Sequence, residues 1–255
     1  MRGTTMRRLA LLVAAAVVSG LVAVSAVVAA DGGTPSSKAT VALDSLIDLS
    51  QAASGSASGG ASSGSTGWHN VLRSTLKTSS QKDLLFDVSL QCGIVTDTTV
   101  KSSGGNTSSA SARGTISVRV LVDGRPALPA NSIDATGASA DGVVFCDRVQ
   151  TLTAKFAGLN CTADATTGEV TCTDPEELQL ILRTLNANAF NFALTDVGVG
   201  VHDLVVQAKA DAAVNFDDDQ SGGSLAGAEA FLGAGTMVVD EVRLVKGLDP
   251  EVDLP

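Results

Sequence analysis

Apolar and polar residues alternate along much of the chain beyond residue 67. Between residues 84 and 94 every even-numbered position is apolar, and Asp87, Ser89 and Gln91 lie between them. The same period of two recurs over residues 116–122, which end at a turn pair. A period of two places successive side chains on opposite faces of a strand. Both segments are therefore predicted to be strands with one buried face.

Further segments are predicted to be strands, although several of them lose the alternating register partway. They are residues 71–76, 143–156, 190–194, 201–210 and 236–245. Seven or more strands separated by turn residues favour two packed antiparallel sheets over a parallel sheet. The predicted fold class is mainly β, an antiparallel β-sandwich of either jelly-roll or immunoglobulin-like topology.

One segment has the period of a helix. Asp174 suits an N-cap, Pro175 suits the first helical position, and two acids follow in the first turn. Apolar residues then recur at helical spacing, at Leu178, Ile181, Leu182 and Leu185. This pattern predicts one short helix near residues 175–187, on an insertion between strands.

The first 30 residues have the charge order of an export signal. Arg2, Arg7 and Arg8 precede an apolar run over residues 9–30, and small residues precede Asp31. This order is typical of a cleaved signal peptide. The run is also long enough to span a bilayer, so a retained membrane anchor is the alternative.

Composition divides the rest of the chain. Residues 31–66 are dominated by Ser, Gly, Ala and Thr, which predicts a flexible linker with a short strand or helical turn allowed at residues 41–47. The predicted organisation is a signal peptide (1–30), this linker (31–66), a β-sandwich domain (67–248) and a C-terminal tail (249–255).

Charge narrows the class of partner. The chain has 17 Lys and Arg against 27 Asp and Glu, a net charge of −10. Nucleic-acid binding needs clustered cations, and here they are sparse and scattered, so nucleic acid is not expected as a partner. We expect a secreted or extracellular location and an extracellular protein or glycan as partner. A membrane association is expected only if residues 9–30 are retained.

Four cysteines follow the apolar run, at Cys92, Cys146, Cys161 and Cys172. In an exported chain they predict disulfides. A segment with a turn signal separates Cys161 from Cys172, so these two can meet across a short hairpin, and Cys92 is left for Cys146. The alternative is a zinc site, but no C-x-x-C is present and both histidines are far from the cysteines in sequence.

The usual catalytic groups cannot be assembled from the histidines. His69 and His202 are the only two. His202 lies where a turn passes into a strand and is predicted to cap that corner through a side-chain hydrogen bond. Asp203 could orient its imidazole, but no nucleophile is marked out as a partner. Residues 60–64 match G-x-S-x-G within the predicted linker, without the strand and helix that a nucleophile elbow needs. We therefore predict no catalytic residues, no cofactor and no enzymatic activity.

Two groups of carboxylates are candidate sites. Asp217, Asp218 and Asp219 lie in a Gly-rich loop and are candidate Ca²⁺ ligands; the alternative is a solvated acidic loop, because the alternating spacing of a calcium loop is absent. Asp240 and Glu241 could serve a secreted hydrolase as acid and base. Successive strand residues face opposite sides of a sheet, however, so these two cannot share one substrate.

The last strand-like segment resembles a known class. Residues 237–244 combine an acidic pair with alternating apolar residues, which resembles the closing strand of jelly-roll carbohydrate-binding modules. The resemblance implies sugar binding, with Trp68 as the aromatic residue to test. Such modules stack aromatic rings on sugars, whereas this chain has one Trp, no Tyr and seven Phe. A non-catalytic binding or structural domain is therefore the first hypothesis, a carbohydrate-binding module the second, and a secreted hydrolase the third.

Overall fold

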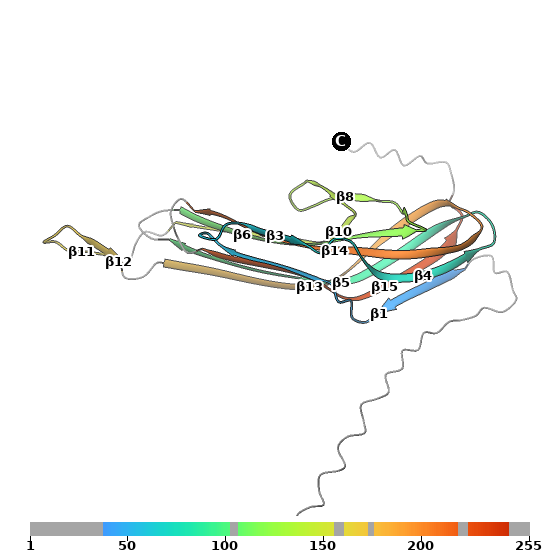
Figure 1. Ribbon diagram of the computed structural model, residues 1–255, viewed down its shortest axis with the longest axis horizontal. Coiled ribbons are helices and arrows are strands. Elements are labelled where there is room, and N and C mark those ends of the chain that lie inside the picture. The colour runs from blue at the N-terminus through green and yellow to red at the C-terminus, as the bar shows by residue number, and fades with distance from the viewer. Residues whose placement is uncertain (1–37, 103–106, 156–160, 173–175, 219–223, 245–255) are drawn as a thin grey trace, which may run out of the picture. The chain divides into compact units, whose positions relative to one another are not determined.

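The computed structural model describes residues 38–102, 107–155, 161–172, 176–218 and 224–244 (Figure 1). All regular structure within these ranges is β-strand, so the prediction of a mainly β chain is confirmed. The predicted signal peptide and C-terminal tail lie outside the described residues. Those residues contain no helix that is long and apolar enough to cross a membrane.

Two antiparallel sheets, here called sheet A and sheet B, contain the long strands. Sheet A consists of β1 (Ala39–Asp44), β2 (Ser50–Ser56), β5 (Lys82–Ser102), β13 (Glu176–Val197) and β15 (Leu225–Val242). β1 and β2 pair with different parts of β15, β15 pairs with β5, and β5 pairs with β13. β13 is therefore an edge strand.

Sheet B forms the second layer. It consists of β3 (Ser62–Ser65), β4 (His69–Thr78), β6 (Thr107–Val122), β7 (Arg125–Pro126), β10 (Val143–Lys155) and β14 (Gly200–Asp218). β10 pairs with β6, β6 with β14, and β14 with both β3 and β4. Two short hairpins complete the described strands: β8 (Asn131–Ile133) with β9 (Ser139–Asp141), and β11 (Cys161–Ala163) with β12 (Val170–Cys172).

The inner faces of the two sheets form the main core. Phe86 and Val88 of β5 and Val118, Val120 and Leu204 of sheet B are fully buried in one cluster. Their positions follow the period of two in the sequence, because each strand turns alternate residues inward. Each such side chain contributes about 1.5–3 kcal/mol when it leaves water. This burial holds the two layers together.

A second part of the interior is built from small and hydroxylated residues. Ala, Val and Thr fill it, and a buried glutamine of β10 crosses between the sheets. Gln150 accepts a hydrogen bond from the Thr96 hydroxyl (2.7 Å) and donates to the Thr98 hydroxyl (2.6 Å) and the Leu180 carbonyl (2.8 Å). Its amide is thus satisfied in the interior, as buried polar groups must be.

The helix predicted near residues 175–187 is wrong. Residues 176–197 form strand β13, which pairs with β5 over nearly its whole length. Leu178, Leu180 and Leu182 also fit a period of two, so the sequence pattern is compatible with either structure. Pairing with β5 selects the strand, because β5 would otherwise present a long row of unpaired backbone groups. The predicted N-cap Asp174 and Pro175 lie outside the described residues.

The structure also differs from the flexible linker predicted for residues 31–66. From Ala39 onward this segment contributes β1, β2 and β3 to the two sheets, and β1 overlaps the strand allowed at residues 41–47. Ile47 and Leu49 are buried in the main core. The small residues serve close packing: a Cβ on Gly55 would lie 2.9 Å from the Gly60 carbonyl. Backbone pairing and tight fit therefore order a segment that composition alone predicts to be disordered.

A disulfide joins Cys92 of β5 to Cys146 of β10, with the two Cα atoms 6.5 Å apart. It links sheet A to sheet B, and it is the pairing that the sequence predicts once Cys161 is assigned to Cys172. Those two residues lie directly opposite each other in the β11–β12 ladder. Their side chains are outside the described part of the structure, so that pairing stays a prediction.

Removal of the inter-sheet disulfide should destabilise the protein strongly. The bridge closes a loop over a separation of 54 residues. By chain entropy it should contribute about 4 kcal/mol, which a Cys92→Ala, Cys146→Ala double variant would lose. Urea unfolding of the wild-type and variant proteins, each with and without reductant, measures this loss. A variant within about 1 kcal/mol of the oxidised wild-type protein would contradict the prediction.

Candidate functional site

A groove on the outer face of sheet B is the strongest candidate site. A loop between β7 and β10, which contains the β8–β9 hairpin, lies over this face. The groove has a volume of about 520 Å³ and is lined by residues of β3, β6, β14 and the loop. The outward residues Thr115 and Ser117 of β6 are buried beneath it. The lining is mostly Ser, Asp, Lys and Arg, so the groove suits a polar ligand.

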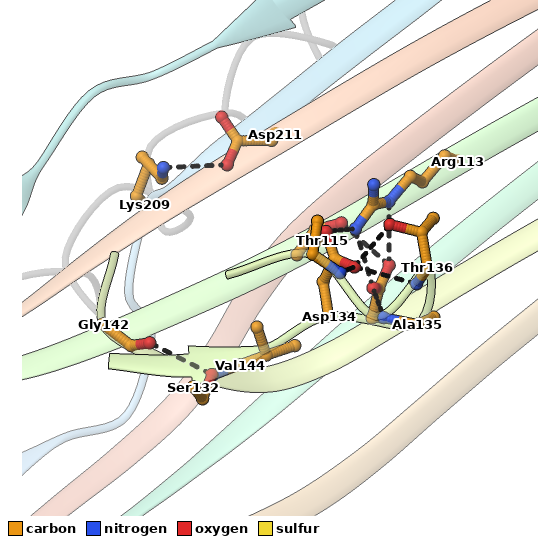
Figure 2. A network of polar contacts seen from close by, with 12 residues as sticks. Arg113, Thr115, Ser132, Asp134, Ala135, Thr136, Gly142, Val144, Lys209 and Asp211 are labelled. Carbon is orange, nitrogen blue, oxygen red and sulfur yellow. Dashed lines mark hydrogen bonds and ion pairs between the residues drawn. The ribbon is translucent and has the colours of Figure 1, made fainter. Parts of the chain in front are cut away.

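A partly buried ion-pair network anchors the loop (Figure 2). The Arg113 guanidinium donates from Nε and Nη2 to the two carboxylate oxygens of Asp147, at 3.2 and 2.9 Å. Asp147 also accepts from the Thr115 hydroxyl (2.8 Å) and the Ala135 backbone N–H (2.7 Å). A bidentate pair of this kind fixes orientation as well as distance.

Asp134 closes the network from the loop. Its carboxylate lies 2.8 Å from Arg113 Nη2 and accepts hydrogen bonds from the Thr136 hydroxyl (2.6 Å) and the backbone N–H groups of Thr136 and Ala138. The Thr136 hydroxyl and the Arg113 guanidinium hold the pKa of Asp134 far below its usual value. Burial opposes the charge of Arg113, but its hydrogen bonds to Asp147 and Asp134 outweigh this effect and raise the pKa of Arg113. Both groups stay charged, and their charges hold the loop.

Trp68 fixes the other end of the loop. Its indole Nε1 donates to Asp141 Oδ2 at 3.1 Å, and the Arg119 guanidinium carbon lies 4.3 Å from a ring centroid. The ring also packs against Gly142, where an added Cβ would lie 2.7 Å from the Trp68 Cη2 atom. Gly142 has φ +86°, a conformation that favours glycine. Trp68 therefore acts as a clamp between the loop and sheet B.

Lys209 and Asp211 form a second ion pair in the groove, and Lys209 Nζ also lies 5.5 Å from a ring centroid of Trp68. Both lie on the outer face of β14, with 3.4 Å between Lys209 Nζ and Asp211 Oδ2 (Figure 2). Their side chains are 24% and 33% exposed. A partly exposed pair at this distance contributes little to stability, so these two groups could exchange their mutual contact for a ligand at small cost.

A second groove lies on the outer face of sheet A. Its volume is about 830 Å³, and Ser and Gly residues of β2, of β3 and of the turn between them line it together with Asp97, Thr99 and Gln179. Gln179 Nε2 donates to both Asp97 oxygens, at 3.0 and 3.2 Å. The G-x-S-x-G match at residues 60–64 begins just before β3 and continues into it, with Ser62 as the first residue of the strand. No helix follows it within the described residues, so it lacks the geometry of a nucleophile elbow.

His202 makes the hydrogen bonds of a corner residue. Its Nδ1 lies 2.7 Å from Asp123 Oδ2, and its Nε2 lies 2.9 Å from the Gly198 carbonyl and 3.1 Å from the Thr78 hydroxyl. The hydrogen bond to Asp123 raises the pKa of His202, and the same bond lowers the pKa of Asp123. Asp203, the orienting acid that the sequence suggests, instead makes a bidentate contact with Arg73.

The structure separates the other candidates from one another. Asp240 is exposed and Glu241 is buried, on opposite faces of β15 as the period of two requires. Glu241 Oε1 has no hydrogen-bond partner among the described residues. His69 is exposed and contacts the Thr66 carbonyl. These groups are not brought together into one site.

The candidate calcium loop is only partly described. Asp217 is exposed near the end of β14, the side chain of Asp218 is outside the described part, and Asp219 lies outside it entirely. Within the described ranges, no three His, Cys, Asp or Glu side chains gather as ligands of a metal ion would. The calcium hypothesis stays a prediction.

Sequence reasoning missed Arg113, Asp134, Asp147 and Asp123. One signal was available: Asp134 stands two residues before Thr136 and three before Gly137, which is the spacing of an Asx turn. Arg113 and Asp147 come from different strands, and only the pairing of β6 with β10 brings them together. Asp123 is recognisable as a turn residue but not as a histidine partner.

Comparisons with known proteins add no argument about function. No protein-family model and no curated protein matches the chain. Two solved structures of infectious bursal disease virus, the Gx and Gt strains, are 8% and 9% identical to it and have TM-scores of 0.12 and 0.11. They cover 85% and 92% of this chain and 45% and 50% of their own, so the chain spans about half the length of those proteins. At these scores the likeness supports no conclusion about fold or function.

The His202–Asp123 contact predicts a pH-dependent stability. The folded-state pKa of His202 is raised above its ordinary value of 6.5, so the contact stabilises fully below pH 6.5 and less as pH rises through the raised pKa. The difference in unfolding free energy between wild-type and His202→Gln should shrink as pH rises from about 5 to about 9. Urea unfolding across this range measures it.

His69→Gln is the matched control, because the His69 side chain is exposed and its one hydrogen bond among the described residues is to the Thr66 carbonyl. It should follow the wild-type curve. A wild-type to His202→Gln difference that is flat, or that grows with pH, would be incompatible with a histidine stabilised by Asp123.

Proposed function

We propose that the chain is an exported, non-catalytic domain with a binding or structural role outside the cytoplasm. The observation that supports this proposal is that charged side chains around the sheet B groove already bind other groups of the protein. Asp134 and Asp147 are bound to Arg113 and to backbone donors, and Asp141 binds Trp68. A general acid or base needs a pKa near the operating pH, whereas the pKa of Asp134 lies far below its usual value. Such carboxylates suit a rigid binding surface.

We further propose that the sandwich is a jelly roll. β1 and β2 pair with two parts of the same strand, β15, and β3 and β4 pair with two parts of β14. Each of these two pairs is therefore counted as one strand position of the sandwich. The eight positions in chain order are then β1/β2, β3/β4, β5, β6, β10, β13, β14 and β15. Sheet A has the order one, eight, three, six and sheet B the order two, seven, four, five. This order supports a double Greek key closed over two sheets.

The extracellular location rests on the N-terminal pattern. Three arginines precede the apolar run of residues 9–30. A disulfide between Cys92 and Cys146 is compatible with an oxidising compartment. Both observations support export, and the excess of acidic residues favours solubility there.

Carbohydrate binding is the second candidate function. It is favoured by the hydroxyl and carboxylate lining of the groove beside Trp68. In this version Lys209 and Asp211 bind the ligand, because Trp68 already packs against Arg119 and Gly142. The sugar would then be held by hydrogen bonds at the groove, and a ring of Trp68 free for stacking is not required.

Substrate assays and a glycan array with the exported chain test the non-catalytic role and the carbohydrate-binding role. We expect no turnover above background with polysaccharide, ester, peptide or phosphate substrates. On a glycan array, a bound glycan should lose at least about tenfold in affinity with Lys209→Ala and Asp211→Ala, because a tenfold loss needs only one good polar contact. Arg73→Ala is the control, since Arg73 forms an exposed ion pair with Asp203 on a different part of sheet B.

Two results would decide against these ideas. Turnover that disappears with His202→Gln or Asp211→Asn would overturn the non-catalytic role and locate an active site. Glycan binding that Lys209→Ala and Asp211→Ala leave unchanged would overturn the groove as the sugar site.

A further inference from the structure

Among the described residues, strand β13 presents a long free edge. On one side it pairs with β5 from Glu176 to Val197. On the other side, the described residues supply one bridge, between Leu128 and Ala193, with both backbone hydrogen bonds at 2.8 Å. The backbone groups of residues 176–192 that point away from β5 therefore have no strand partner within the described part of the chain. Such an edge is a template for another strand.

The first half of this edge is also apolar on its inner side. Leu178, Leu180 and Leu182 lie opposite Val100, Thr98 and Thr96 in the β13–β5 ladder, and those three β5 residues are buried. The leucines share the same face, yet they are 46%, 39% and 41% exposed. Sheet B does not cover them fully. An apolar stripe next to unpaired backbone is what proteins normally protect with charges, Pro or bulges.

One acidic and one basic residue flank the apolar stripe, at equal distances on either side of Leu180. Glu177 lies three residues before Leu180 and Arg183 lies three residues after it, on the opposite face of β13 from the leucines. Glu177 contacts Lys101 at 3.0 Å. Arg183 is exposed and makes no ion pair with any of the described residues.

We propose that a second copy of this chain pairs antiparallel with β13 about a twofold axis at Leu180. In this register Leu180 faces the partner's Leu180, and Leu178 faces the partner's Leu182. Glu177 then faces the partner's Arg183, and the exchange occurs twice because the interface is isologous. A register centred one residue earlier or later sets Glu177 opposite Ile181 or Leu185 instead. Only the register at Leu180 matches leucine with leucine and acid with base together.

The pairing joins sheet A of the two copies into one continuous sheet. Backbone hydrogen bonds along residues 176–184 supply affinity, the leucines of both copies cover one another on the inner side, and the outer charges fix the register. This inference does not rest on the proposed function, since the β13 edge and the sheet B groove share no residues.

Charge reversal tests the register directly. The full exported chain should sediment as a dimer at micromolar concentration. Arg183→Glu places a second carboxylate opposite Glu177, and Glu177→Arg places a second guanidinium opposite Arg183. Each variant alone should therefore dissociate at least about tenfold more readily. An equimolar mixture of the two variants allows opposite charges to face each other again and should recover the dimer.

Controls separate the interface from folding. Each variant should keep the wild-type far-UV spectrum and melting transition. Val149→Lys, on the outer face of β10, an edge strand of sheet B, should leave the dimer intact. Where a reversal impairs folding, Leu180→Cys replaces it, and it should give a disulfide-linked dimer that Leu185→Cys does not. A monomeric wild-type chain, or an assembly that both reversals leave unchanged, would overturn the proposal. Either result leaves the substrate and glycan assays of the proposed function unaffected.

Discussion

The inner face of β5 is the constraint on which the rest of the structure depends. Its even-numbered side chains, from Leu84 through Ile94 and on to Val100, are each at most 4% exposed. A strand buried so continuously must be covered along its length by a second sheet and flanked by strands on both sides. β15 and β13 supply the flanks, and β6 and β10 of sheet B supply the cover. The disulfide at Cys92 and the hydrogen bonds of Gln150 then tie β5 to the opposite sheet at particular points.

The same inward burial explains why the outer face of sheet B presents polar and charged side chains. Because β6 and β14 direct alternate residues inward, Arg113, Thr115 and Lys209 are forced outward onto one surface. A loop can cover that surface only if its polar groups find partners. Asp147 and Asp134 provide them, and the resulting groove is rigid because its walls are held by charge-assisted hydrogen bonds.

The sequence predicts those strands whose own alternation of apolar and polar residues determines their structure. The alternation at residues 84–94 and 116–122 identifies the centres of β5 and β6, and Cys92 lies on the buried face of its strand as expected.

The sequence does not predict the structure of segments that become ordered by pairing with another strand. The apolar residues between Leu178 and Leu185 fit a helix as well as a strand, and only the unpaired edge of β5 selects between them. The Ser- and Gly-rich residues 50–56 and 62–65 form strands because β15 and β14 offer partners, which local composition cannot reveal. The candidate site was missed for a related reason, since Arg113 and Asp147 meet only through the register of β6 with β10.

Pairing with β5 and β15 orders β13 and β2 as strands, against the local preference of their sequences. Amide hydrogen exchange of the full chain, followed by NMR, tests this claim residue by residue. We expect strand chemical shifts over residues 50–56 and 176–197, and slow exchange for the amides that face β15 and β5. Helical shifts over residues 176–187, or exchange of both segments at the rate of an unstructured chain, would contradict it.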